Sequence, residues 1–182
     1  MDPSDLMKNQ GIIATASNDL MDLFGPEFTV TENGHIETDI AAAATLAGLL
    51  ILRGKFPALP ALEPGSVFLS PMDEEMNLIR MFAAGVCKSL GLDPNGGWNT
   101  EIPKEHLPLW SIPEMTRKLE KRCTETCSRH NLPKEYSPYA SVLVAMRLVS
   151  AGNKLGILDQ NIGKALVAYH VYGGARTIPF TD

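Results

Sequence analysis

Apolar residues recur every three or four positions along much of the chain, which is the spacing of one face of an amphipathic helix. Met76, Ile79, Ala83, Val86 and Leu90 follow this spacing without a miss. The same pattern predicts helices over residues 4–24, 71–90, 111–130, 137–151 and 160–172. The stretch 137–151 has Arg147 as its one charged residue, and a helix that is apolar on nearly all sides is expected at the centre of a fold.

Two of these helices begin with a recognisable start signal. Ser70 is followed by Pro71 and, three residues later, by Asp73, whereas Ser111 is followed three residues later by Glu114. A serine at the N-cap and an acid three residues on can satisfy free backbone N–H groups of the first turn. We therefore expect Ser70 and Ser111 to be N-caps.

The longest apolar run, residues 40–52, predicts a further, buried helix that Asp39 would cap. This run is shorter than the ~20 residues that a helix needs to cross a bilayer. Within it, Ala43, Ala44, Ala47 and Gly48 lie three or four positions apart and would let another helix approach closely. We expect that contact inside one core, with helix pairing between two copies as the alternative.

Two other segments alternate between apolar and polar residues, which is typical of strands. Residues 28–31 and 35–38 flank Asn33-Gly34 and predict a hairpin. A two-residue turn is one alternative, but a three-residue loop pairs Val30 with Ile36 and gives the better hydrophobic register. Residues 66–69 are the candidate third strand.

Together these elements predict a predominantly helical α+β fold. Five or six helices would pack around the helix over residues 139–151, with a small two- or three-stranded antiparallel sheet at one side. We expect residues 1–182 to form a single domain, in which residues 1–38 could make a small lobe of one helix and one hairpin.

Composition narrows the class of protein. Hydrophobic residues make up 45% of the 182 residues and charged residues 20%, which is ordinary for a globular chain. Lys and Arg number 16 against 21 Asp and Glu, so a partner of the nucleic-acid or anionic-membrane kind is not expected. The acidic start lacks the pattern of a secretory signal, and 3 cysteines suit a reducing compartment. We therefore expect a soluble, cytoplasmic protein.

The cysteines offer a weak alternative of a metal site. Cys123, Cys127 and His130 fall on one helix face, with Cys87 elsewhere in the chain. Residues seven apart on a helix are separated by ~10.5 Å along its axis, too far for one zinc ion to bind both. We therefore predict that the cysteines are buried core residues and that the protein has no metal and no cofactor.

The C-terminal segment contains the residues best suited to bind a ligand. His170, Tyr172, Gly173, Gly174 and Arg176 lie within seven positions, and Arg176 suits a carboxylate or phosphate. The plainer interpretation, which we favour, is a helix end at which one glycine has a positive φ. A hairpin over residues 168–180 is a third alternative.

No catalytic or cofactor motif stands out, so we do not expect an enzyme. The leading prediction is a binding or assembly module with a protein partner or with self-association into a homo-oligomer. The alternative is a small-molecule-binding enzyme or sensor with an anion site at the Gly173-Gly174 turn. A concave pocket that gathers polar residues from separate segments would favour the alternative, and a flat apolar patch would favour the module.

Overall fold

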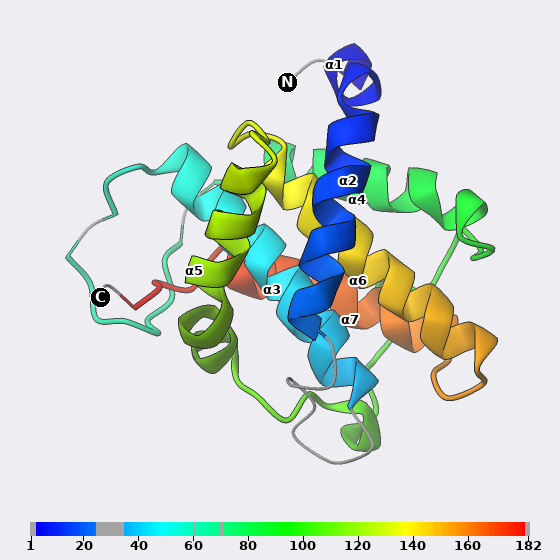
Figure 1. The fold of residues 1–182 in the computed structure, drawn as a ribbon. Coiled ribbons are helices and arrows are strands. Elements are labelled where there is room, and N and C mark those ends of the chain that lie inside the picture. The colour runs from blue at the N-terminus through cyan, green and yellow to red at the C-terminus, as the bar shows by residue number, and fades with distance from the viewer. Residues whose placement is uncertain (1–2, 25–34, 60, 70, 181–182) are drawn as a thin grey trace.

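The computed structural model describes residues 3–24, 35–59, 61–69 and 71–180. All regular secondary structure in these ranges is helical (Figure 1). Single 3-10 turns lie at Asp22–Phe24 and Lys104–His106. The α-helices are α1 (Pro3–Lys8), α2 (Gln10–Met21), α3 (Ile36–Lys55), α4 (Asp73–Ser89), α5 (Ile112–Arg129), α6 (Ser137–Lys154) and α7 (Gln160–Gly174).

Helices α3 and α6 form the centre of the fold. Helix α3 packs against α5, α6 and α7, and α6 also packs against α2, α4 and α7 (Figure 1). The alanine-rich part of α3 is buried on every side. Because alanine side chains are short, the neighbouring helices can approach α3 from several directions at once.

The predicted sheet is wrong, and within the described residues the fold is helical rather than α+β. Residues 28–34 of the predicted hairpin lie outside the described ranges, and residues 36–38 form the first turn of α3. His35, rather than Asp39, is the N-cap, and its Nδ1 accepts from the Thr38 N–H at 3.2 Å. The imidazole therefore satisfies a first-turn donor, and α3 begins four residues earlier than Ile40.

The candidate third strand, residues 66–69, makes one antiparallel bridge, between Val67 and Thr177. The Phe68 N–H donates to the Arg176 carbonyl at 2.7 Å, and the Ile178 N–H donates to the Ser66 carbonyl at 2.9 Å. Prolines at 64, 71 and 179 border this pairing. Because proline lacks an N–H, it cannot extend a ladder, and the pairing stays too short to be a sheet.

The starts of two helices were predicted with different success. The carboxylate of Glu114 accepts from the Ser111 N–H at 2.8 Å, and the Ser111 side chain accepts from the Glu114 N–H, which together form the predicted capping box of α5. Helix α4 instead begins at Asp73 with Met72 as its N-cap. The other expected N-cap, Ser70, lies outside the described residues.

The C-terminal glycines do not end α7 in the expected way. Both lie in the helix, and neither has a positive φ. A Cβ atom on Gly174 would overlap the Thr45 carbonyl oxygen of α3, and one on Gly48 would overlap the Val171 carbonyl oxygen of α7. The two glycines therefore serve a close crossing of α3 and α7 within one molecule. Since residues 168–174 are helical, the hairpin alternative is wrong.

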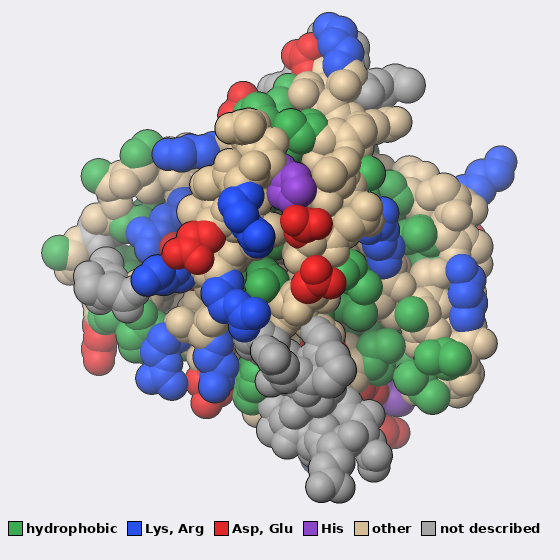
Figure 2. Space-filling model, viewed as in Figure 1, with side chains coloured by type: hydrophobic (Ala, Val, Ile, Leu, Met, Phe, Trp, Pro, Cys, Tyr) green, Lys and Arg blue, Asp and Glu red, His purple; other side chains and the backbone are tan. Residues whose placement is uncertain are grey.

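Charge is spread unevenly over the surface. On the face drawn in Figure 2, Lys and Arg side chains gather over α5 although the net charge of the chain is −5. The exposed basic residues of α5 are Arg117, Lys118, Lys121, Arg122 and Arg129. Among the described helices, none combines the length and the apolar character that crossing a membrane requires.

Candidate functional site

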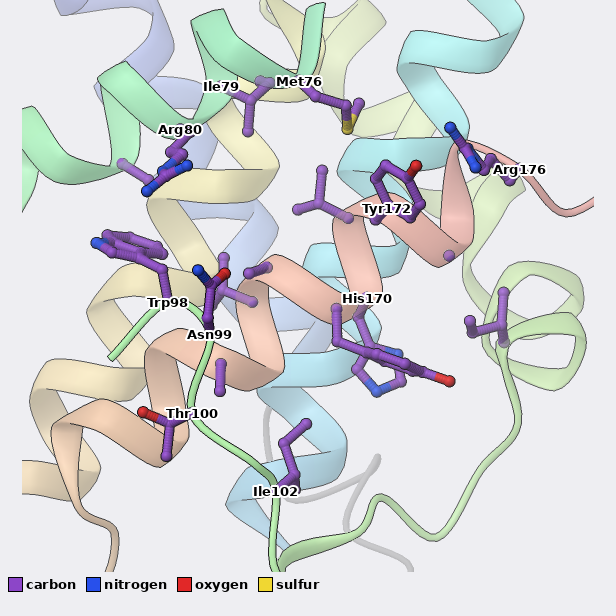
Figure 3. Close-up of a pocket in the computed structure, with 18 of the residues that line it drawn as sticks. Met76, Ile79, Arg80, Trp98, Asn99, Thr100, Ile102, His170, Tyr172 and Arg176 are labelled. Atoms are coloured by element: carbon purple, nitrogen blue, oxygen red, sulfur yellow. The ribbon is translucent and has the colours of Figure 1, made fainter. Parts of the chain in front are cut away.

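A cleft of about 1400 Å³ runs along α7. Helix α4 borders it on one side and the irregular segment 98–108 on the other (Figure 3). Apolar side chains such as Met76, Ile79 and Ile102 provide much of its wall. The polar side chains come from α4, from the irregular segment, from α7 and from the residues that follow α7: Asp73, Asn77, Arg80, Trp98, Asn99, Thr100, Glu101, Tyr169, His170, Tyr172, Arg176 and Thr177. Two of them, Asp73 and Glu101, are carboxylates.

Residues 93–97, which lead into the irregular segment, are held against the first turns of α7. Lys164 is fully buried, and its ammonium donates to the Asp93 carbonyl at 2.9 Å. The Asp93 N–H donates to Gln160 Oε1 at 2.8 Å. Gly97 has φ +79°, and a Cβ there would lie 2.6 Å from Asn161 Oδ1. These contacts set the place where Trp98 and Asn99 enter the cleft wall.

The end of the same segment is fastened to the first turn of α3. His106 Nδ1 lies 2.7 Å from Glu37 Oε1, and the Leu109 N–H donates to Thr38 Oγ1 at 2.9 Å. The Lys118 ammonium lies 4.9 Å from the centre of the Trp110 ring. Since both ends are held, the residues between them form a defined wall of the cleft.

Arg176 is the most unusual group in the cleft. Its guanidinium lies 4.0 Å from the centre of the Tyr172 ring. Its Nε is sealed from solvent and has no hydrogen-bond partner in the part of the chain that the structure describes. A buried donor without an acceptor costs about 1–3 kcal/mol of folding free energy. The arrangement therefore holds the guanidinium in place with a sealed Nε that donates to no described residue.

His170 lies on the opposite flank of α7. Figure 3 shows Tyr172 and Arg176 pointing toward α4, whereas His170 lies on the other side of the helix. Its side chain is 5% exposed, and its Nδ1 lies 3.3 Å from Thr45 Oγ1 of α3. Burial lowers the pKa of His170 to about 4, so this imidazole is neutral at pH 7.

The structure thus divides the residues predicted at the C-terminus. His170, Tyr172, Gly173 and Arg176 all line the cleft. Gly174 does not line it, because it packs against Thr45 of α3. Gly173 and Gly174, which were to form the anion-binding turn, are therefore helical. His170 and Tyr172 lie on two flanks of α7, and Arg176 lies in the turn after it.

Sequence reasoning missed the part of the cleft that α4 and the irregular segment provide. Residues 93–110 do form the longest irregular stretch, and such stretches are often functional, which was the available signal. Arg80 gave none, because an exposed arginine is ordinary on the polar face of a helix. Lys164 could not be singled out either, because lysine is usually exposed and nothing in the sequence marks this one as buried.

The alternative metal-binding residues are not gathered. Cys87, Cys123 and Cys127 are buried free thiols, as the core interpretation predicts. His130 instead pairs with Asp19, with 2.8 Å between Nε2 and Oδ2. Within the described ranges, no group of three or more His, Cys, Asp or Glu side chains is placed to hold a metal ion.

Comparison with protein families, with characterised proteins and with solved structures gave no match. The function must therefore be inferred from the cleft itself.

Proposed function

We propose that this protein binds a small organic anion in the cleft, with Arg176 as the partner of the anionic group. The observation that carries the proposal is the Arg176 guanidinium, which is stacked on Tyr172 and has a buried Nε without an acceptor. A carboxylate or phosphate fits the planar donors of a guanidinium and would accept from its terminal N–H groups, because Nε itself is sealed.

The ligand also needs an apolar body. Met76 and Ile79 of α4 lie across the cleft from Tyr172, and Trp98 adds an aromatic ring farther along (Figure 3). Small-molecule sites typically combine such an apolar wall with a few placed polar groups. An amphipathic carboxylate or phosphate ester therefore fits the cleft better than an inorganic ion does.

This proposal takes the alternative function that the sequence left open, in place of the leading one. A cleft with polar groups from separate segments is the feature expected of a small-molecule site, whereas an assembly module needs a flat apolar patch. We propose binding without a reaction, because the neutral His170 with a pKa of about 4 is a poor base at pH 7. Buried free thiols support a reducing, cytoplasmic location.

The test uses Trp98 as a reporter inside the cleft. A Trp110→Phe background leaves Trp98 as the one tryptophan of the chain, which has 2. The probes are octanoate, benzoate and phenyl phosphate, with 1-octanol as the uncharged match for octanoate. We expect octanoate to change Trp98 emission and to bind at least about 10-fold tighter than octanol, since a charge-assisted hydrogen bond contributes about 1.5–3 kcal/mol.

Arg176→Ala should remove this preference for the anion. Arg129→Ala is the matched control, because Arg129 is an exposed arginine of α5 that does not line the cleft. Equal binding of octanoate and octanol to the parent protein contradicts the proposal, as does full retention of the preference in Arg176→Ala. A lack of response to every anionic probe also contradicts it.

A further inference from the structure

The His170 flank of the cleft has a chemistry of its own. His170 is more than nine-tenths buried, yet it lines the cleft together with Ile102, Leu107 and Ile112. The Tyr169 ring meets its imidazole edge to face, with 5.1 Å between ring centres. An imidazole in such an apolar wall is held in one orientation, which allows its hydrogen-bonding atoms to be assigned individually.

The contacts of Thr45 bear on the tautomer of His170. Thr45 is fully buried, and its hydroxyl donates to Met115 Sδ at 3.4 Å. With its one hydrogen donated to Met115 Sδ, the Thr45 oxygen accepts from His170 Nδ1–H, 3.3 Å away. A neutral imidazole with its proton on Nδ1 has a lone pair and no hydrogen on Nε2.

His170 Nε2 is open to the cleft. The atom makes no hydrogen bond with any described residue. Among the described residues, Arg176 Nε is a sealed side-chain nitrogen that lacks a partner, whereas His170 Nε2 is not sealed. An unpartnered atom of a buried residue that is not itself sealed can be reached from the cleft.

We propose that this flank is a second subsite, which takes an uncharged hydroxyl or N–H group on an apolar ring or chain, with His170 Nε2 as the hydrogen-bond acceptor. The subsite goes beyond the anion site and does not depend on Arg176, because the two residues lie on opposite flanks of α7 (Figure 3). Since burial keeps the imidazole neutral, it offers no charge that would attract a second anion.

The first test reads the tautomer by long-range ¹H–¹⁵N NMR at pH 7. We expect protonated Nδ1 and bare Nε2 on His170, and a shift of the Nε2 resonance when phenol is added. Phenol is uncharged at this pH, since the pKa of a phenolic hydroxyl is about 10. A proton on Nε2, or phenol binding that leaves Nε2 unchanged, overturns the proposal, and this measurement needs no variant.

The second test compares phenol with anisole, which has the same ring but no O–H. We expect phenol to bind 2- to 10-fold tighter, as for one net hydrogen bond of about 0.5–1.5 kcal/mol. His170→Phe should bring the ratio of the two affinities to about 1, and His130→Phe, outside the cleft, should leave it unchanged. A ratio near 1 in the parent protein, or an unchanged ratio in His170→Phe, overturns the subsite. Benzoate binding in the same samples reports on the anion site separately.

Discussion

The face of α7 that crosses α3 and the face that borders the cleft are built from different residues. At the crossing, Gly174 meets the backbone of α3 at Thr45, and Gly48 meets the backbone of α7 at Val171. Along the cleft, α7 presents aromatic side chains, of which Tyr172 is 43% exposed, and the charged Arg176 lies in the turn after the helix. Contact between backbones leaves no room for change, whereas contact through long side chains can be rearranged. One short helix thus combines a rigid support with an adaptable binding wall.

The strongest test of the difference between the packed face and the cleft face replaces the adjacent Gly173 and Gly174, one at a time, with alanine. Gly174→Ala places a methyl group against the Thr45 carbonyl, and we expect a loss of ~3 kcal/mol in the free energy of unfolding. Gly173→Ala meets the end of the Ile112 side chain, which can rotate away. Because alanine also favours a helix by ~1 kcal/mol over glycine, this variant should stay within ~1 kcal/mol of the parent protein.

Urea unfolding of both variants at pH 7 provides the measurement, and Gly48→Ala serves as an independent check from the α3 side. Equal losses in Gly173→Ala and Gly174→Ala would show that the two faces of α7 are equally tight. The contrast between packed face and cleft face would then have no energetic basis.

The same contrast explains which features the sequence predicted. Some features depend only on residues one or two turns apart, and these were predicted. The small residues around Gly48 allow the expected close helix crossing, and the start signal at Ser111 forms the expected capping box. The sheet was mispredicted because alternation over residues 35–38 is too short to distinguish a strand from the first turn of a helix. His35 decided between them through a side-chain cap that propensity does not anticipate.

The cleft was predicted only in part, for a geometric reason. Tyr172 and Arg176 are four positions apart, so their stacking fits a helical spacing that continues into the turn after α7. That Arg80 and Trp98 line the same cleft depends on how α4 and the irregular segment pack, and neither residue is close to Tyr172 in the sequence. The buried contact of Lys164 with Asp93, which fixes that segment, is likewise set by the tertiary fold.

The burial of His170 should be visible in the pH dependence of stability. This residue contacts Thr45 of α3 and also lines the cleft, so it lies between the packed face and the cleft face of α7. Its pKa falls from 6.5 to about 4 on burial. Between pH 6.5 and pH 4 the unfolded chain therefore takes up a proton that the folded protein does not, and acidification destabilises the fold. Burial acts oppositely on Asp39, whose pKa rises from 3.8 to about 7, so the folded protein takes up that proton first and gains stability.

These opposite slopes predict a specific pair of curves. In an Asp39→Asn background, acidification from pH 6.5 to pH 4 should lower the free energy of unfolding by up to ~3 kcal/mol more than in Asp39→Asn/His170→Gln, since one pKa unit corresponds to 1.36 kcal/mol. Urea unfolding at half-unit pH steps measures the difference. Parallel curves would mean that His170 is solvated as an ordinary histidine and that the cleft face reaches deeper into α7 than the structure shows.

The smallest expected effect concerns Arg176 and Tyr172 on the cleft face. Their stacking should contribute about 0.5–1 kcal/mol, measured as the coupling free energy in a double-mutant cycle of Arg176→Ala and Tyr172→Ala. Arg176→Ala alone should change the free energy of unfolding by less than ~1 kcal/mol, because the lost stacking is offset by removal of a buried Nε that has no acceptor. Gly174, two positions away, should be several times more sensitive. A loss above ~2 kcal/mol in Arg176→Ala would make this arginine a structural residue of the packed face, and an unpartnered guanidinium would no longer indicate a site awaiting an anion.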